Sequence, residues 1–247
     1  MQKIKTLIVG LGKIGFLHDN EIKNSYISHT KALKKFKYTE LVCGVDMNKS
    51  IRLKFKKKYN IDTSNNLKDS IIRHNPEFVI ISVTTSNLYK VLVSISKFQT
   101  IKYVLVEKPV GYDHNKIKKI FNVYKKKRKK LFINYNRSYQ KKFFGHFSKY
   151  KTNKYFKSIF FYNQGLLNNC SHFLNLILMF LDLPKKVLIL DKGNSLKKDI
   201  QPDVKLIFKN GEVYLISNEK SGNSKSKYVF FDGINKVYSE DNFTKLI

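Results

Sequence analysis

The feature that most constrains the fold is a glycine-rich turn that directly follows an apolar run near the start of the 247-residue chain. Residues Ile4–Val9 are mostly apolar and branched, which suits a buried strand, and Gly10, Gly12 and Gly15 follow at the G-x-G-x-x-G spacing. In that pattern the first glycine allows a tight turn, the second lets the backbone approach a pyrophosphate, and the third lets a helix pack closely on the sheet. The stretch therefore predicts a dinucleotide site.

The pyrophosphate would lie on the free N–H groups and the positive dipole end of the helix that follows the turn. We therefore expect cofactor contacts along the whole turn, from Gly10, Leu11, Gly12, Lys13, Ile14 and Gly15.

Asp46 ends a second predicted strand, Glu40–Val45, where a dinucleotide fold binds the adenosine ribose hydroxyls. The alternative is that Asp46 caps the helix that starts at Asn48–Lys49. A carboxylate at this position favours NAD, because the 2′-phosphate of NADP would meet its negative charge. Lys49 and Arg52 are close enough in sequence to keep NADP open.

Apolar strand patterns alternate with helical patterns over the first 135 residues or so. This alternation predicts an α/β fold, with an N-terminal Rossmann domain built on a doubly wound parallel sheet over residues 1–136. The first helical pattern, Lys13–Phe36, has room for a loop near Asn20–Ser28. The later predicted elements are helices at Ile51–Tyr59, Leu67–His74, Tyr89–Phe98 and from about Asp113, and strands at Phe78–Val83, Tyr103–Val106 and Leu131–Tyr135.

The remaining residues, 137–247, have a different pattern. A connecting helix is expected at Ser138–Tyr150 and an apolar helix at Phe173–Leu183, followed by short strands separated by glycine-containing turns. Asn210-Gly211 between two apolar runs predicts a hairpin. The second half is therefore expected to be a smaller α+β domain with a mostly antiparallel sheet.

Composition excludes several classes of protein. Lys and Arg number 48 against 18 Asp and Glu, a formal charge of +30, but the lysines are spread along every segment, so we expect no nucleic-acid partner. The densest run, Lys125–Lys130, is expected to be a solvated helix end.

No stretch approaches the roughly 20 apolar residues of a membrane span. Cys43 and Cys170 are too few for a disulfide framework or a cysteine-based zinc site, which agrees with a reducing compartment. We therefore expect a cytoplasmic protein and no metal.

Two further groups of residues follow predicted strands, at the edge where parallel sheets bind ligands. Thr84, Thr85 and Asn87 follow Phe78–Val83, and Glu107-Lys108-Pro109 follows Tyr103–Val106. Lys108 could hydrogen-bond both the nicotinamide ribose and a substrate oxygen. The alternative is that Glu107 and Lys108 are an ordinary surface pair before a turn.

Taken together, G-L-G-K-I-G, G-V-D, T-T-S-N, V-E-K-P-V-G and N-Y-N-R resemble the Gfo/Idh/MocA family of NAD(P)-dependent oxidoreductases over nearly all of the first 140 residues. The resemblance implies a Rossmann domain followed by an α+β domain whose sheet lines the substrate pocket and often makes the oligomer contact. It also implies hydride transfer between nicotinamide and a sugar or sugar-nucleotide carbon. The expected partners are thus a small sugar substrate and further copies of the chain.

The family's second motif resembles D-x-G-x-H-x-x-D, and the chain offers Asn168, Cys170, His172 and Asn175 at those positions. By resemblance His172 is the general base, Asn168 a positioning group and Lys108 the residue that orients the hydroxyl. The preceding G-L-L-N-N run resembles a branch of the family seen near surface-polysaccharide genes. Without the resemblance, His172 would be interpreted as a helix-cap or core histidine.

Arg137, Tyr139 and Asn175 are candidate substrate-binding residues, the alternative for Arg137 and Tyr139 being packing at the domain junction. An alternative function is also open. Amides in place of carboxylates at Asn168 and Asn175, together with a short C-terminal domain, are compatible with a dinucleotide-binding protein that has lost turnover.

Overall fold

The chain folds into two compact units, Met1–Asn134 and Tyr135–Ile247, each with its own sheet. The computed structural model describes residues 2–19, 21–23, 25–139, 155–196, 199–218, 227–231, 236–240 and 245–246. Most of the connecting helix predicted at Ser138–Tyr150 lies outside these residues. Among the described residues, no helix has the length and hydropathy to cross a membrane.

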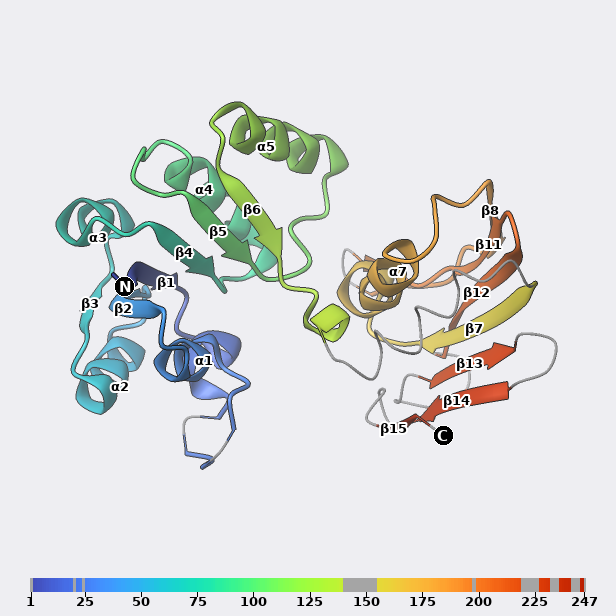
Figure 1. Cartoon of the computed structure of the whole chain (residues 1–247), viewed down its shortest axis with the longest axis horizontal. Coiled ribbons are helices and arrows are strands. Elements are labelled where there is room, and N and C mark those ends of the chain that lie inside the picture. The colour runs from blue at the N-terminus through green and yellow to red at the C-terminus, as the bar shows by residue number, and fades with distance from the viewer. Residues whose placement is uncertain are drawn as a thin grey trace. The chain divides into compact units, whose positions relative to one another are not determined.

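The first unit is built on six parallel strands in the order β3-β2-β1-β4-β5-β6 (Figure 1). This order reverses direction next to β1, so the sheet is doubly wound, and the predicted Rossmann fold is confirmed. The strands are β1 (Ile4–Val9), β2 (Thr39–Val45), β3 (Asp62–Ser64), β4 (Phe78–Ile81), β5 (Tyr103–Val106) and β6 (Lys130–Ile133).

Helices cover both faces of this sheet. On one face Phe16, Leu33 and Phe55 pack against Ile8 and Ile80. On the other face, buried side chains of α3, α4 and α5 pack against the alternate residues of the same strands. The helical elements are a π-helical turn η1 (Lys13–Leu17), α1 (His29–Lys35), α2 (Lys49–Tyr59), α3 (Leu67–His74), α4 (Thr85–Ile95) and α5 (His114–Lys126).

The first helical pattern is interrupted, as the sequence allowed. Helical structure stops after Leu17 and resumes at His29. Asp19 organises the segment between them: it is fully buried, and its Oδ2 accepts hydrogen bonds from the Ile27 amide at 2.6 Å and the Ser28 amide at 3.2 Å. Burial disfavours the charged carboxylate, but these bonds outweigh it and lower the pKa of Asp19.

The lysine run at the end of α5 differs from its prediction. Lys129 is buried rather than solvated, and its Nζ donates to the Phe98 carbonyl at 2.5 Å and the Ile101 carbonyl at 2.6 Å. Burial lowers the pKa of Lys129. These carbonyls lie in the loop after α4. Lys129 therefore joins this loop to the segment that follows α5.

The second unit has a seven-stranded sheet in the order β15-β14-β13-β7-β12-β11-β8, in which the β12–β7 pair is parallel and every other pair antiparallel. The predicted smaller domain with a mostly antiparallel sheet is confirmed. The strands are β7 (Phe156–Tyr162), β8 (Lys186–Asp191), β11 (Asp203–Phe208), β12 (Gly211–Ser217), β13 (Lys227–Phe231), β14 (Lys236–Glu240) and β15 (Lys245–Leu246), beside a separate pair, β9 (Ser195–Leu196) and β10 (Asp199–Ile200).

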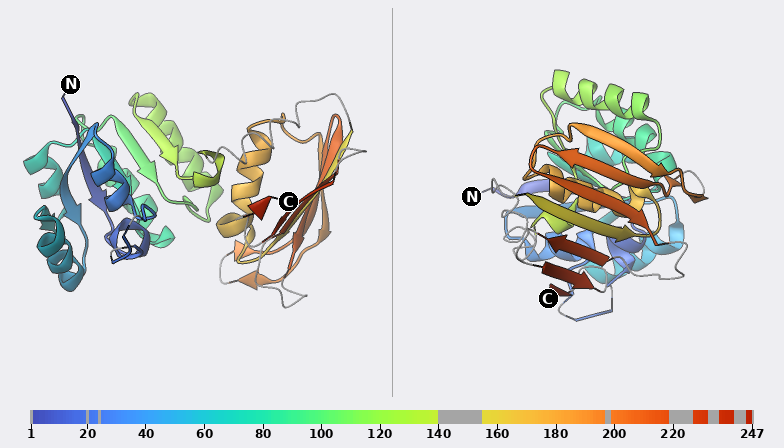
Figure 2. Two further views of the ribbon diagram at one scale, coloured as in Figure 1. Left: turned by 60° about the horizontal axis from the view of Figure 1, so that its bottom comes forward. Right: turned by 90° about the vertical axis from the view of Figure 1, so that its right-hand side faces the viewer.

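One face of this sheet is covered by α7 (Ser171–Leu178) and by the π-helical turn η4 (Leu166–Cys170) that precedes it (Figure 2). Phe173, Leu176 and Ile177 of α7 are buried against Phe160 and Leu215 of the sheet. The helix starts two residues earlier and ends five residues earlier than the predicted Phe173–Leu183. A 3-10 turn, η2 (Asn136–Tyr139), begins the unit.

The predicted hairpin at Asn210-Gly211 is present, because β11 and β12 pair with Phe208 opposite Gly211. The turn itself is formed by Lys209 and Asn210, so Gly211 is already in the strand. A Cβ at Gly211 would lie 2.4 Å from the Phe156 ring. The close contact with the Phe156 ring, and not the turn, therefore explains why residue 211 is a glycine.

Candidate active site

The glycine turn has three different steric environments. Gly10 has φ +93°, and a Cβ there would lie 2.6 Å from the Ser82 carbonyl oxygen. A Cβ at Gly15 would lie 2.0 Å from the Gly10 carbonyl oxygen, so this glycine lets η1 pack on the turn. A Cβ at Gly12 would meet no atom within 4 Å. Gly12 thus leaves open space beside the backbone, where a dinucleotide pyrophosphate fits.

Asp46 connects the end of β2 to this turn. Its Oδ2 accepts a hydrogen bond from the Leu11 amide at 2.7 Å, and its Oδ1 accepts one from the Asn48 amide at 2.8 Å. The N-cap of α2 is Asn48, not Asp46, so the capping alternative is wrong. Arg52 donates to the Asp46 carbonyl at 2.7 Å and to the Met47 carbonyl at 2.9 Å, which brings a guanidinium to the same strand end.

A pocket of about 470 Å³ lies over the turn. Five predicted cofactor residues line it, namely Gly10, Gly12, Asp46, Thr84 and Asn87. Of the others, Leu11 points its side chain into the core, Gly15 is buried, and Lys13 and Ile14 are on the surface of the turn. Thr85 is the first residue of α4, whose N-cap is Thr84. These threonines therefore start a helix, four residues before the predicted start at Tyr89.

Sequence reasoning missed several pocket residues. Ser82 is the most informative, because its Oγ donates to the Gly10 carbonyl at 2.7 Å and so fixes the turn to the end of β4. A hydroxyl inside the otherwise apolar run Phe78–Val83 was the available signal. The other residues that line the pocket without having been predicted are Val9, Val45, Met47, Asn65, Leu67, Val83, Lys90 and Val91.

Glu107 follows β5 and is mostly buried, which contradicts the interpretation of this residue as part of a surface pair. Its Oε1 lies 2.8 Å from His29 Nε2 and accepts a hydrogen bond from Asn134 Nδ2 at 2.6 Å. Burial disfavours the charged carboxylate, but the two hydrogen bonds and the neighbouring Lys108 charge outweigh it and lower the pKa of Glu107. His29 and Asn134 carry no motif that would have identified them.

In the second unit His172 lies in the first turn of α7 and is buried, with 8% of its surface exposed. Its ring meets the ring of Tyr135 edge-on, with centroids 5.8 Å apart. Asn175, one turn further on, accepts a hydrogen bond from Ser138 Oγ. Within this unit the structure thus places His172 against Tyr135 and Asn175 against Ser138 of η2.

The predicted substrate residues of η2 differ in environment. Arg137 is stacked over the Phe173 ring with its guanidinium carbon 5.0 Å from the centroid, and burial lowers the pKa of Arg137 to about 10, so it is charged at neutral pH. Tyr139 is 78% exposed. Arg137 thus packs against Phe173 inside the unit, whereas Tyr139 presents its ring to solvent.

A carboxylate that the sequence did not reveal holds the turn before His172. Asp199 on β10 is buried and accepts hydrogen bonds from the Leu167 amide at 2.9 Å and the Asn168 amide at 2.8 Å. Gly165 has φ +94°, and a Cβ there would lie 2.1 Å from Asp199 Oδ2. Asp199 therefore fixes the backbone of Asn168, although it lies 31 residues along the chain.

Comparison with known proteins agrees with this geometry. Residues 4–135 match the model of the Gfo/Idh/MocA oxidoreductase family, described as having an NAD-binding Rossmann fold. This match confirms the predicted NAD cofactor at the level of the family. No curated protein matches the chain.

Solved structures share the fold over nearly the whole chain at low sequence identity. The WlbA dehydrogenase from Bordetella pertussis, in complex with NADH and UDP-GlcNAcA, is 12% identical with a TM-score of 0.78, covering 100% of this chain and 76% of its own. A myo-inositol dehydrogenase from Corynebacterium glutamicum is 13% identical with a TM-score of 0.75, covering 96% and 75%. GenD2 from gentamicin A biosynthesis, in complex with NAD, is 14% identical with a TM-score of 0.73, covering 97% and 73%.

Proposed function

The chain belongs to the Gfo/Idh/MocA oxidoreductase family, and from that premise we propose that it is an NAD(P)-dependent enzyme that transfers a hydride between nicotinamide and a sugar or sugar-nucleotide carbon. The observation that carries the proposal is the open cradle at Gly12, with Asp46 and the start of α4 lining the same pocket. Two of the structural neighbours are named as dehydrogenases, one in complex with a UDP-sugar and the other for myo-inositol.

Different residues of the pocket bind different parts of the cofactor. The backbone from Gly10 to Gly15 binds the pyrophosphate, and Asp46 accepts hydrogen bonds from the adenosine ribose hydroxyls. Thr84, Thr85 and Asn87 contact the cofactor from the N-terminal end of α4. NAD is the preferred form because of the Asp46 carboxylate, while Arg52 gives NADP a counter-charge close to the same strand end.

Lys108 and His172 are the proposed catalytic residues. The Lys108 ammonium, with Glu107 beside it, orients the substrate hydroxyl and stabilises the negative charge that develops on its oxygen. His172 accepts the hydroxyl proton, since imidazole is the side chain whose ordinary pKa is near neutrality. When bound, the oxidised nicotinamide would accept the hydride from the substrate carbon. Asn168 positions the substrate, and Arg137, Tyr139 and Asn175 contribute to its binding.

The G-L-L-N-N run before His172 supports a place in the branch of the family that is seen near surface-polysaccharide genes. The two free thiols, Cys43 and Cys170, support a cytoplasmic location.

We also propose that the chain is a homo-oligomer that assembles through the open face of the second unit's sheet. On β7 and β12 every other residue belongs to the face that α7 does not cover. Ile159, Phe161, Tyr214 and Ile216 are apolar residues of this face that a second copy of the same face could bury, beside the Lys205–Glu212 ion pair and Lys157 on the same side.

The test of the enzymatic proposal is a spectrophotometric assay. The protein is incubated with NAD or NADP and a panel of sugar nucleotides and free sugars, while the absorbance of the reduced nicotinamide is followed. We expect turnover of at least one sugar nucleotide by the wild type. Lys108→Met should abolish it, while NAD affinity stays within about tenfold, or about 1.4 kcal/mol.

The substitution of amides at Asn168 and Asn175 favours a second function, a dinucleotide-binding protein without turnover. Tight NAD binding with no reduction of the cofactor by any member of the panel would support that function and contradict the enzymatic one. Restoring the family's carboxylate with Asn168→Asp then distinguishes the two further. A gain of turnover in this variant alone would identify Asn168 as the cause of lost activity.

A further inference from the structure

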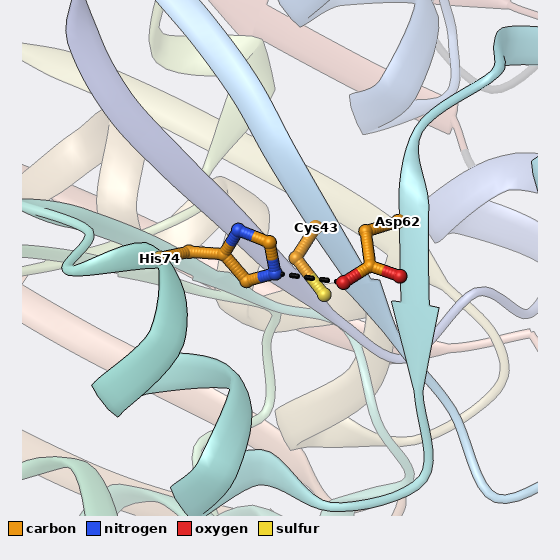
Figure 3. A group of neighbouring side chains, drawn as sticks. All are labelled: Cys43, Asp62 and His74. Carbon is orange, nitrogen blue, oxygen red and sulfur yellow. Dashed lines mark hydrogen bonds and ion pairs between the residues drawn. The ribbon is translucent and has the colours of Figure 1, made fainter.

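Three side chains with metal-binding atoms lie together at the outer edge of the first unit's sheet (Figure 3). Cys43 on β2 and Asp62 on the edge strand β3 are register partners, and His74 is the last residue of α3. Their Sγ, carboxylate oxygen and imidazole nitrogen lie within 4.8 Å of one another. None of the three lines the cofactor pocket, so this cluster is separate from the proposed NAD site.

We propose that Cys43, Asp62 and His74 form a binding site for a divalent transition-metal ion of the zinc class. The donor set of one thiolate, one imidazole and one carboxylate is the mixture of sulfur, nitrogen and oxygen that Zn²⁺ accepts. The sequence led us to expect no metal, because two cysteines are too few for a cysteine-based zinc site, but a mixed site needs only one. Folding assembles a mixed site from residues that are 19 and 12 positions apart in the sequence, a spacing that matches no zinc motif.

The distances need only a small adjustment to accept the ion. With metal–ligand bonds of about 2.0–2.3 Å, ligand atoms around a tetrahedral zinc ion are separated by about 3.3–3.8 Å. His74 Nε2 and Asp62 Oδ2 are 2.9 Å apart, and all three ligand atoms lie within 4.8 Å of one another. Side-chain rotations that move these atoms by about 1 Å therefore suffice. The ion would take the place of the proton shared by the histidine and the carboxylate.

Access and a fourth ligand are available on the same side. A pocket of about 570 Å³ is lined by Asp62 and His74 together with residues of α1 and β2. Their side chains are 35% and 18% exposed, whereas Cys43 is fully buried beneath them. A water molecule from this pocket can therefore complete the tetrahedron.

Charges of both signs surround the cluster: Lys3, Lys34, Lys37 and Glu40 line the access pocket, and the three lysines are exposed, so they can turn to solvent when a cation binds. Arg73 Nη1 lies 3.5 Å from Asp62 Oδ2, but the Arg73 side chain is 69% exposed and can turn to solvent when the ion binds. Asp62 Oδ1 accepts a hydrogen bond from the Thr63 amide at 2.9 Å, which leaves Oδ2 directed at His74. The ion would join the short edge strand β3 to β2 and to the end of α3, and thereby stabilise the folded unit.

The experiment uses metal-free full-length protein, prepared with a chelator and a thiol reductant, and titrated with Co²⁺ as a spectroscopic substitute for Zn²⁺. We expect saturation at one equivalent, with visible bands typical of four-coordinate cobalt and a near-ultraviolet thiolate-to-cobalt charge-transfer band. Zn²⁺ should displace the cobalt and abolish both features. Absence of the charge-transfer band in the wild type would overturn the proposal.

Matched variants locate the ion. Cys43→Ser should lose the charge-transfer band, while Cys170→Ala, which removes the other cysteine, should keep it. His74→Gln should weaken cobalt binding at least tenfold, whereas His114→Gln, on an exposed helix start, should not change it. A band that persists in Cys43→Ser, or equal binding by the two histidine variants, would refute the site.

A stability measurement covers the case in which Cys43→Ser does not fold. Zn²⁺ should raise the unfolding temperature of the wild type and of His114→Gln, and EDTA should reverse the rise. In His74→Gln the rise should be largely lost. An equal rise in both histidine variants would place the ion elsewhere and overturn the proposal.

Discussion

Among single residues, Asp46 holds the glycine turn in place, and under the proposed function the same carboxylate also binds the adenosine ribose. One oxygen holds the Leu11 amide and the other the Asn48 amide, so the charge is fixed at the entrance to the glycine turn. A carboxylate oxygen has two lone pairs, so the same atoms can also accept from ribose hydroxyls. Under the proposed function, this anchored charge would link the shape of the turn to the choice between NAD and NADP.

Asp46→Asn removes the negative charge but keeps one acceptor oxygen, which can still accept from the Leu11 amide while the bond to the Asn48 amide is lost. We expect the ratio of NADP to NAD affinity to rise by about tenfold, equivalent to about 1.4 kcal/mol. Isothermal titration with both cofactors measures this ratio, and Asp69→Asn, on α3, is the control. An unchanged ratio would contradict the assignment of Asp46 to the ribose.

Glu107 gives a pH-dependent prediction. Its pKa is lowered in the folded protein, so its contribution to stability is present above the ordinary glutamate value of about 4.3 and is lost as the pH falls through the lower folded value. Glu107→Gln should therefore cost about 1–3 kcal/mol of unfolding free energy at pH 7 and less at about pH 3, below the ordinary glutamate pKa. Urea unfolding at both pH values measures the difference. A pH-independent cost, or the same profile in the exposed control Glu40→Gln, would contradict the role of the charge.

At the scale of elements, the turn η4 depends on a distant carboxylate. Asp199 accepts from two amides of this turn, and an asparagine side chain has only one acceptor atom. Asp199→Asn should destabilise the protein by about 1–2 kcal/mol, the usual scale for a lost cap. Chemical denaturation measures the change, with the exposed Asp182→Asn as a matched control in the same unit. Equal stability of the two variants would show that Asp199 does not hold the turn.

The elements also show what could be predicted from the sequence. Strands β1, β2, β4 and β5 were predicted to within a few residues, because branched apolar runs bounded by glycine or polar residues have few alternatives. The glycine spacing and Asp46 also predicted the position of the pocket, because each is identified from a short stretch of sequence. The three-residue strand β3 was missed, because Asp62–Ser64 has no apolar pattern.

Contacts between distant positions could not be predicted. Ser82 on Gly10, His29 and Asn134 on Glu107, and Asp199 on Asn168 join residues 27 to 78 positions apart, and no local pattern marks such pairs. The break before α1 was foreseen, but Asp19, which holds the intervening loop, was not. Local motifs therefore predict the position of the candidate site, but the polar contacts that hold it together join residues far apart in the sequence.

At the scale of the whole molecule, the open sheet face of the second unit predicts self-association. Phe161→Asp introduces a charge at the centre of that face, and we expect it to lower the mass measured by sedimentation equilibrium to that of the monomer. Leu183→Asp removes a residue that is 79% exposed outside the sheet and should leave the mass unchanged. A monomeric wild type, or an unaltered mass for Phe161→Asp, would contradict assembly through this face.

We propose that the turn from Gly10 to Gly15 binds NAD, and a substitution at Gly12 is the sharpest test of this proposal. Because a Cβ at Gly12 would meet no atom within 4 Å, Gly12→Val should fold as the wild type does, while its side chain occupies the space meant for the pyrophosphate. Isothermal titration with NAD should show affinity weakened about 100-fold, or about 2.7 kcal/mol, at an unchanged unfolding temperature. NAD affinity equal to that of the wild type would contradict the account.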